Sequence, residues 1–172
     1  MKRVLMFIMV FTVLSGTSLI AEKGSANIFG GIGFAFSDLE GIAIHLGGEM
    51  AFTDNIWGQV VIDYLPSPFG DLPDGVSAST FNFGLFAMYK HALNEKTNLF
   101  GKAGLIYNSN SVSGTAFGFT AVVNESGIGF GGGAGVDLKL DEKKAITVGA
   151  DIYSREEALW VKIYAGFSLK VK

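Results

Sequence analysis

The sequence predicts an all-β fold, an eight-stranded antiparallel up-and-down transmembrane β-barrel, on the basis of three observations. Eight short stretches alternate apolar residues with small or polar ones, which is the period of two expected for a β-strand with unlike faces. In each stretch, one of the two parities carries no charged residue. These stretches follow an N-terminal segment that has the features of an export signal.

The N-terminus has the composition of a signal peptide. Lys2 and Arg3 precede an apolar stretch, 4–14, that is too short to cross a bilayer as a helix. We expect residues 1–21 to be the signal peptide, with cleavage after Ser18 as the alternative. Residues 22–172 then form the barrel, because about 150 residues suit one domain.

The composition excludes several other classes of protein. A net charge of −3 offers no basic surface for nucleic acid. The absence of cysteine excludes a disulfide scaffold and a lipid-modified N-terminal cysteine. After residue 14, no apolar run approaches the ~20 residues that a membrane helix needs.

The first four strands are expected, in chain order, at 27–36, 42–52, 56–65 and 81–91. In the second of them, every second residue is apolar or glycine: Ile42, Ile44, Leu46, Gly48, Met50 and Phe52. Asp54 and Asn55 form a tight turn into the third strand. Three prolines and their polar neighbours indicate a long loop, 66–80, before the fourth strand.

The last four strands are expected at 99–107, 128–140, 146–152 and 161–171. Short polar connections at 94–96, 141–144 and 154–157 separate most of them. A second long loop is expected at 108–127. Within it, 115–123 alternates weakly and could extend the hairpin of the fifth and sixth strands; a ninth strand would break the even count.

The lengths of the connections predict the orientation of the barrel. The even-numbered connections are short and polar or charged, whereas two of the odd-numbered ones are long. Bacterial outer-membrane barrels have short periplasmic turns and longer extracellular loops. We therefore expect 66–80 and 108–127 outside the cell and both termini in the periplasm.

The charge-free parity is expected to face lipid, because a Lys or Arg at the middle of the bilayer costs about 2–4 kcal/mol. The opposite parity then forms an ion-pair network in the lumen, made of Glu49, Asp63, Lys90, Lys102, Asp137, Lys139, Asp151 and Lys162. We expect Asp63, Asp151 and Lys162 nearer the loop end and the other five nearer the turn end. An eight-stranded barrel is only wide enough for side chains, which favours a plug over a gated or ion-selective path.

A soluble barrel of the lipocalin type is the competing architecture. It would turn the apolar parity inward and expose the strand glycines Gly129, Gly131, Gly133 and Gly135 to water. Such a strand has poor β-propensity. In a narrow membrane barrel the same glycines face inward and make room for the few large side chains.

Aromatic residues are expected to form two girdles at the membrane interfaces. The loop-side girdle is made of Phe34, Phe36, Tyr64, Phe81, Phe83, Tyr107 and Phe130. The turn-side girdle is made of Phe52, Tyr89 and Phe167.

Two segments with an architectural pattern resemble a known family. They are Gly101-Lys102-Ala103-Gly104-Leu105-Ile106-Tyr107 and Gly129-Phe130-Gly131-Gly132-Gly133-Ala134-Gly135-Val136-Asp137. With the strands so placed, the whole mature chain resembles the OmpA/OmpX-like family of small outer-membrane β-barrels, often labelled porin-like. The resemblance implies a monomer in the cell outer membrane, in contact with lipid and lipopolysaccharide.

The residues offer little for catalysis, and we expect neither a cofactor nor a metal. Some barrels that this fold resembles act on lipid A, which requires a nucleophile, a base and an orienting acid. His45 with Asp63 is a conceivable pair, but no histidine stands near Ser109 or Ser111 in the chain. No group of residues has metal-ligand spacing.

The expected function is therefore that of a non-enzymatic integral outer-membrane protein with a structural or surface-interaction role and a lumen plugged by side chains. The loops 66–80 and 108–127 are the expected contact sites for a surface partner, since they carry apolar side chains. A narrow ion or small-solute channel is the alternative, and a lipid A-modifying enzyme is a third possibility.

Overall fold

Eight strands make up almost all of the chain that the computed structural model describes, which is residues 24–66, 68, 74–116, 119–156 and 158–171. The strands are β1 (Ala26–Ser37), β2 (Gly41–Ala51), β3 (Ile56–Leu65), β4 (Val76–Asn94), β5 (Thr97–Ala116), β6 (Phe119–Lys139), β7 (Lys144–Arg155) and β8 (Ala158–Lys170). The predicted signal peptide, 1–21, lies outside the described residues. Within them, no helix is long and apolar enough to cross a membrane.

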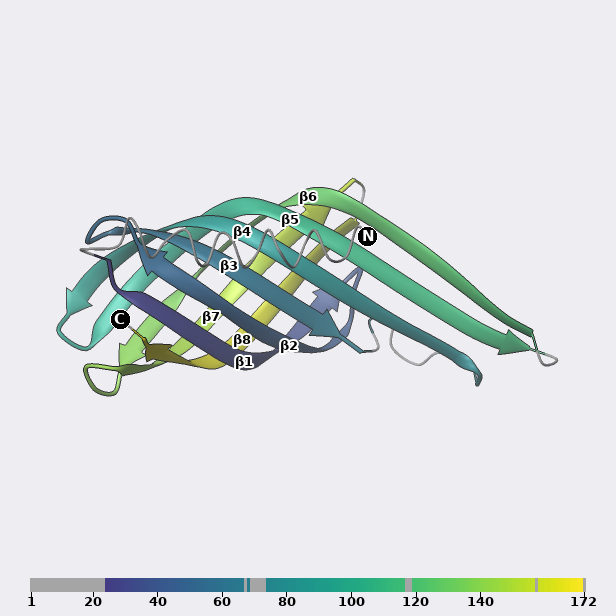
Figure 1. The fold of residues 1–172 in the computed structure, drawn as a ribbon, viewed down its shortest axis with the longest axis horizontal. Helices are drawn as coiled ribbons and strands as arrows, with labels where there is room; N and C mark the ends of the chain where they lie inside the picture. The colour runs from purple at the N-terminus through teal and green to yellow at the C-terminus, as the bar shows by residue number, and fades with distance from the viewer. Residues whose placement is uncertain (1–23, 67, 69–73, 117–118, 157, 172) are drawn as a thin grey trace.

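The strands form one closed antiparallel barrel in which each strand pairs with its neighbours in chain order (Figure 1). β1 closes the ring against β8, with register running from Asn27 opposite Lys170 to Ser37 opposite Trp160. The predicted fold class, an eight-stranded up-and-down transmembrane barrel, is confirmed. We call the end with the β2–β3, β4–β5 and β6–β7 connections the turn end and the opposite end the loop end.

The predicted loops are partly wrong, because β4, β5 and β6 continue well beyond the expected bounds. β4 begins at Val76, so only 66–75 connects it to β3. The predicted loop 108–127 is strand on both sides of 117–118, which lies outside the described residues. The hairpin register continues from Tyr107 opposite Ile128 to Ala116 opposite Phe119. The alternative that 115–123 extends this hairpin is therefore confirmed.

This extension of β4, β5 and β6 projects past the rest of the barrel at the loop end (Figure 1). On β4 and β5 its outward parity carries small polar residues in place of large apolar ones, including Ser77, Ser79, Ser109, Ser111 and Ser113. The apolar half of the alternation, which marks strands inside the membrane, is thus missing. The physical reason for the wrong prediction is that strand pairing continues where burial in lipid ends.

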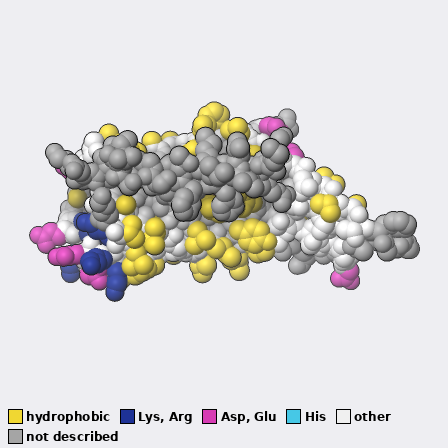
Figure 2. Space-filling model, in the orientation of Figure 1, with side chains coloured by type: hydrophobic (Ala, Val, Ile, Leu, Met, Phe, Trp, Pro, Cys, Tyr) yellow, Lys and Arg dark blue, Asp and Glu magenta, His cyan; other side chains and the backbone are white. Residues whose placement is uncertain are grey.

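The two faces of the barrel wall differ as the charge pattern predicts. Large apolar side chains point outward and are exposed, as Ile32 and Phe130 are at 67% and 72%. They lie on all eight strands and so form an apolar belt around the barrel. Figure 2 shows part of this belt on one face, with charged side chains gathered at the turn end. The extension beyond the belt is mostly uncharged on this face (Figure 2).

Inward glycines make room for aromatic rings. A Cβ on Gly131 would lie 2.8 Å from Cδ1 of Tyr153 and 3.0 Å from Cε1 of Phe86. A Cβ on Gly149 would lie 2.7 Å from Cζ of Tyr164. The strand glycines therefore allow a narrow barrel to hold large side chains in its lumen.

Candidate functional site

The middle of the lumen holds a buried polar cluster, here called the inner cluster, made of His45, Asp63, Lys102, Asp151, Tyr153 and Lys162. Nζ of Lys162 donates hydrogen bonds of 2.7 Å to both carboxylate oxygens of Asp63 and lies 3.3 Å from Oδ2 of Asp151. Nζ of Lys102 lies 2.9 Å from Oδ1 of Asp151. Two lysines thus offset two carboxylates, as buried charges require.

Strand register explains why these residues meet. Lys102 lies opposite Gly133, Gly133 opposite Asp151, and Asp151 opposite Lys162, so three charges stand in one row across four strands. His45 lies opposite Asp63 in the β2–β3 pair. Residues directly opposite each other in an antiparallel pair have neighbouring side chains.

His45 and Asp63 form the pair considered as a dyad, with Nδ1 2.6 Å from Oδ1. The imidazole is 1% exposed, and its ring centroid lies 4.4 Å from that of Tyr164. Its Nε2 is buried without a partner among the described residues. Ser109 and Ser111 belong to the outward parity of β5, opposite in direction to Lys102, so neither hydroxyl faces the imidazole.

A second group of charges lies toward the turn end, and we call it the turn-side triad: Glu49, Lys90 and Asp137. Nζ of Lys90 donates to Oε1 of Glu49 at 2.6 Å and to Oδ2 of Asp137 at 2.8 Å. The ammonium also lies 4.5 Å from the ring centroid of Trp57. Thr147 donates a 2.7 Å hydrogen bond to the other oxygen of Asp137. The triad carries one more carboxylate than lysine.

Two of the predicted network residues differ from their expected places. Lys102 belongs to the inner cluster, not to the turn-end group, because strand tilt and stagger shift the height at which a residue meets its neighbours. Lys139 has an exposed side chain and takes no part in the ion pairs found among the described residues. It is the last residue of β6, where its side chain reaches water at the turn end.

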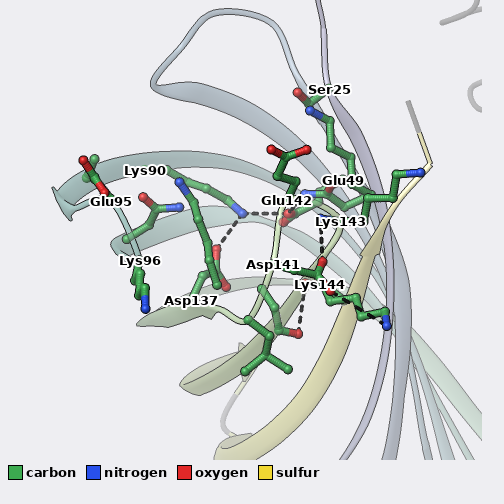
Figure 3. Close-up of a pocket in the computed structure, with 18 of the residues that line it drawn as sticks. Ser25, Glu49, Lys90, Glu95, Lys96, Asp137, Asp141, Glu142, Lys143 and Lys144 are labelled. Carbon is green, nitrogen blue, oxygen red and sulfur yellow. Dashed lines mark hydrogen bonds and ion pairs between the residues drawn. The ribbon is translucent and has the colours of Figure 1, made fainter.

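The turn-end vestibule has a volume of about 860 Å³ and has the turn-side triad among its lining residues. Figure 3 shows Lys90 between Glu49 and Asp137, with side chains of the β6–β7 connection, among them Asp141 and Lys143, beside them. Both acidic and basic side chains line its wall, Lys139 among them. This end of the lumen is open and mixed in charge.

The loop-end vestibule has a volume of about 460 Å³ and is lined by Asp38, Leu39, Asn108, Asn110, Glu125, Arg155, Glu156, Ala158 and Trp160. An apolar cluster lies between it and the inner cluster, and includes Leu39, Leu65, Phe86, Ile106 and Trp160. Pro68 of the β3–β4 connection is buried, and its carbonyl accepts a 2.7 Å hydrogen bond from the amide of Glu40. The β1–β2 and β3–β4 connections are thus tied together at this end.

Between the inner cluster and the turn-side triad lies a cavity of about 10 Å³, lined by His45, Glu49, Asp137 and Tyr164 among others. Such a volume is close to the least that holds one water molecule. Across the part of the chain that the structure describes, no group of three or more His, Cys, Asp or Glu side chains could hold a metal ion.

The ten residues predicted for the aromatic girdles all face outward, and none is buried. Phe34, Phe36, Tyr64 and Phe130 are exposed on the loop side, while Phe52, Tyr89 and Phe167 are exposed on the turn side. Phe81, Phe83 and Tyr107 are half-buried by their neighbours in the wall. Their role at the membrane interfaces stays a prediction.

Several lumen residues are not among the predicted site residues. Tyr153 hydrogen-bonds both carboxylates of the inner cluster, and Gln59 accepts a 3.0 Å hydrogen bond from Lys102. Arg155 is 7% exposed, donates to Asn108 and forms an ion pair with Glu125. Inward parity is the signal that could have found Gln59 within its predicted strand, and Tyr153 one residue past the predicted end of its strand. Arg155 lies in a segment predicted as a connection, where parity has no meaning.

The comparisons with known proteins rest on structure, since neither a family model nor a curated sequence matches the chain. Neisserial surface protein A has a TM-score of 0.63 at 14% identity, over 86% of this chain and 96% of that one. A major outer membrane protein of Thermus thermophilus has the same score and identity, over 87% and 100%. The attachment invasion locus protein Ail of Yersinia pestis has a TM-score of 0.58 at 14% identity, over 86% and 96%.

The class that these findings define is the eight-stranded transmembrane β-barrel of outer-membrane proteins. At 14% identity the likeness concerns the fold. The arrangement of charges in the lumen follows from the side chains of this chain and not from the likeness in fold.

Proposed function

We propose that the protein is a non-enzymatic integral outer-membrane barrel whose lumen is closed by side chains and whose role is structural or one of surface interaction. The signal-like N-terminus, the apolar belt and the barrels of similar fold support the location. The projecting extension of β4, β5 and β6 supports placing the loop end outside the cell, because outer-membrane barrels project on that side.

The observation that carries the closed lumen is the stack of buried layers between the two vestibules. The turn-side triad, the inner cluster and the apolar cluster follow one another, and the cavity between the two charged layers has a volume of about 10 Å³. Each charge of the inner cluster has an opposite partner within 3.3 Å. Paired, dehydrated charges offer no free path to a hydrated ion.

Planar-bilayer recording tests this proposal against the narrow channel. We expect no stable conductance steps from the purified protein at neutral pH. Stable steps that vanish in Lys102→Met or Asp137→Asn would overturn the plug and favour an ion path through the lumen. Lys139→Met is the matched control, because that lysine is exposed and lies outside both charged layers.

The enzymatic alternative rests on the His45–Asp63 pair. The burial of this pair argues against access of a lipid substrate to it. The outward direction of Ser109 and Ser111 keeps both hydroxyls away from the imidazole, so neither could serve it as a nucleophile. We expect the mass spectrum of lipid A to be the same with and without the protein. A mass change that disappears in His45→Asn would establish a catalytic role instead.

A further inference from the structure

We propose that the loop-end vestibule is a binding site for a saccharide that is neutral or carries amino groups. The inference deepens the proposed surface-interaction role, since it relies on the loop end facing outward. The volume of about 460 Å³ lies within the usual range of small-ligand sites. One wall is the inner face of the β5–β6 extension, and the facing wall comes from the β7–β8 and β1–β2 connections.

The polar groups of the vestibule are held in fixed directions. Arg155 donates a 3.0 Å hydrogen bond to Oδ1 of Asn108, whose amide nitrogen donates at 2.7 Å to Asn82. Oδ1 of Asn110 accepts a 2.8 Å hydrogen bond from Thr80. Amides and carboxylates together provide both donors and acceptors. A ligand rich in hydroxyl groups matches that mixture, because each hydroxyl both donates and accepts.

An apolar ring lies at the base of this site. Trp160 is 2% exposed, lines the vestibule and belongs to the apolar cluster. Its Nε1 is shielded from the vestibule, so the ring offers a ligand an apolar surface and no hydrogen bond. A sugar ring has apolar faces and hydroxyl edges, and it therefore suits a site that combines this apolar base with polar walls.

Charge narrows the class of saccharide. Three carboxylates, Asp38, Glu125 and Glu156, line the vestibule against the single guanidinium of Arg155. This excess of negative charge disfavours sulfated or phosphorylated sugars. In that respect the site differs from Ail, one structure of which is a complex with the heparin analogue sucrose octasulfate.

The rim of the vestibule has an unusual backbone. Ser37 and Glu156, with φ of 90° and 52°, are the described residues other than glycine that have a positive φ. Ser37 adjoins Asp38, and Glu156 itself lines the vestibule. The carboxylate of Asp38 accepts a 2.6 Å hydrogen bond from the amide of Leu159, which ties the β1–β2 connection to the start of β8. Such conformations are costly and concentrate at functional sites.

Titration of the refolded protein in detergent micelles with three defined probes tests the proposal. Isothermal calorimetry should detect saturable binding of the trimer of N-acetylglucosamine and of the glucosamine trimer, and none of sucrose octasulfate. Asn110→Ala should weaken binding about fivefold, the value of one hydrogen bond. Ser111→Ala is the matched control, because it is the next residue on β5 and faces the other way.

Absence of saturable binding of both sugar trimers would overturn the proposal. Stronger binding of sucrose octasulfate than of the sugar trimers would also overturn it. So would a loss of affinity in Ser111→Ala as large as that in Asn110→Ala. Heat-modifiable migration of both variants on electrophoresis shows whether each barrel is folded, which we expect because Asn110 and Ser111 are only half-buried.

The saccharide could belong to surrounding lipopolysaccharide or to an external glycan. Calorimetry in vesicles with complete lipopolysaccharide and in vesicles with lipid A alone separates these sources. Weaker binding in complete lipopolysaccharide identifies its sugars as the occupant, whereas equal binding identifies an external glycan; both outcomes support the site. If the barrel inserts and conducts no ions but binds neither sugar, the saccharide site is refuted and the proposed function stands.

Discussion

Lys162 joins the two carboxylates of the inner cluster. Its ammonium contacts Asp63, Asp151 and the hydroxyl of Tyr153, and the side chain is 1% exposed. A charge in such a place is stable only with its partners, because the desolvation of an unpaired ion costs several kcal/mol. The cluster therefore stabilises the barrel as a unit, and its members cannot be changed singly without cost.

Replacement of Lys162 by methionine should destabilise the barrel by about 3–5 kcal/mol, since it leaves a buried carboxylate uncompensated. Urea unfolding of the protein in lipid vesicles, followed by tryptophan fluorescence, measures the change. Lys139→Met should change the free energy of unfolding by less than about 0.5 kcal/mol, because that side chain is exposed. Equal effects of the two substitutions would contradict the buried ion-pair cluster.

Gly131→Ala should destabilise the barrel by about 1–3 kcal/mol through overpacking. The new methyl group would lie 2.8 Å from a ring carbon of Tyr153 and 3.0 Å from one of Phe86. Gly101→Ala is the control, because its methyl group would face outward with its nearest neighbour at 4.0 Å. The same unfolding measurement applies, and no loss in Gly131→Ala would show that the rings have room to shift.

At the scale of elements, the hairpin of β5 and β6 has two parts with different requirements. Up to Tyr107 and Ile128, its outward positions carry apolar residues or glycine. Beyond them, the outward positions 109, 111 and 113 of β5 are serines, and Ser77 and Ser113 are joined by a 2.7 Å contact between their hydroxyl oxygens. The second part depends on strand pairing and not on lipid.

Shortening this hairpin should leave the barrel folded. Ser111 and Asn124 lie opposite each other, so an Asn-Gly turn can replace residues 112–123 and close the hairpin at that pair. We expect the shortened protein to keep its heat-modifiable migration in detergent. Loss of the folded band would show that the extension stabilises the barrel.

At the scale of the whole molecule, the apolar belt defines where the barrel meets lipid. Ile32 and Val122 are both outward-facing and exposed, at 67% and 56%, but only Ile32 lies within the belt. Ile32→Arg should destabilise the folded protein in vesicles by about 2–4 kcal/mol, and Val122→Arg by about 0–1 kcal/mol. Urea titration in vesicles measures both changes. Equal costs would mean that the belt does not mark the membrane.

Much of the fold can be predicted because a membrane barrel has a strict local pattern. Each strand must place uncharged side chains toward lipid, and this requirement acts on every second residue without reference to distant parts of the chain. The bounds predicted for β3 on this basis are confirmed at Ile56–Leu65. The same pattern does not predict the extension of β4, β5 and β6, because above the membrane no such requirement acts on the outward residues.

The candidate sites are less predictable, because they depend on heights in the barrel and on contacts across it. Lys102 forms an ion pair with Asp151 because β5, β6 and β7 are staggered relative to one another. The position of Lys102 within β5 does not reveal this stagger. The loop-end vestibule brings together Asp38, Asn110 and Arg155, which are far apart in the chain. The spacing of these residues along the sequence therefore could not predict that they line one vestibule.

By itself, the sequence determined the strand number, the face toward lipid and the inward direction of the charges, because the period of two and the cost of charge in lipid act locally. Tertiary structure alone decided which inward charges pair and where water can enter. These depend on register and strand stagger around a closed ring, through which Lys162 meets Asp63 and Trp160 lines a vestibule.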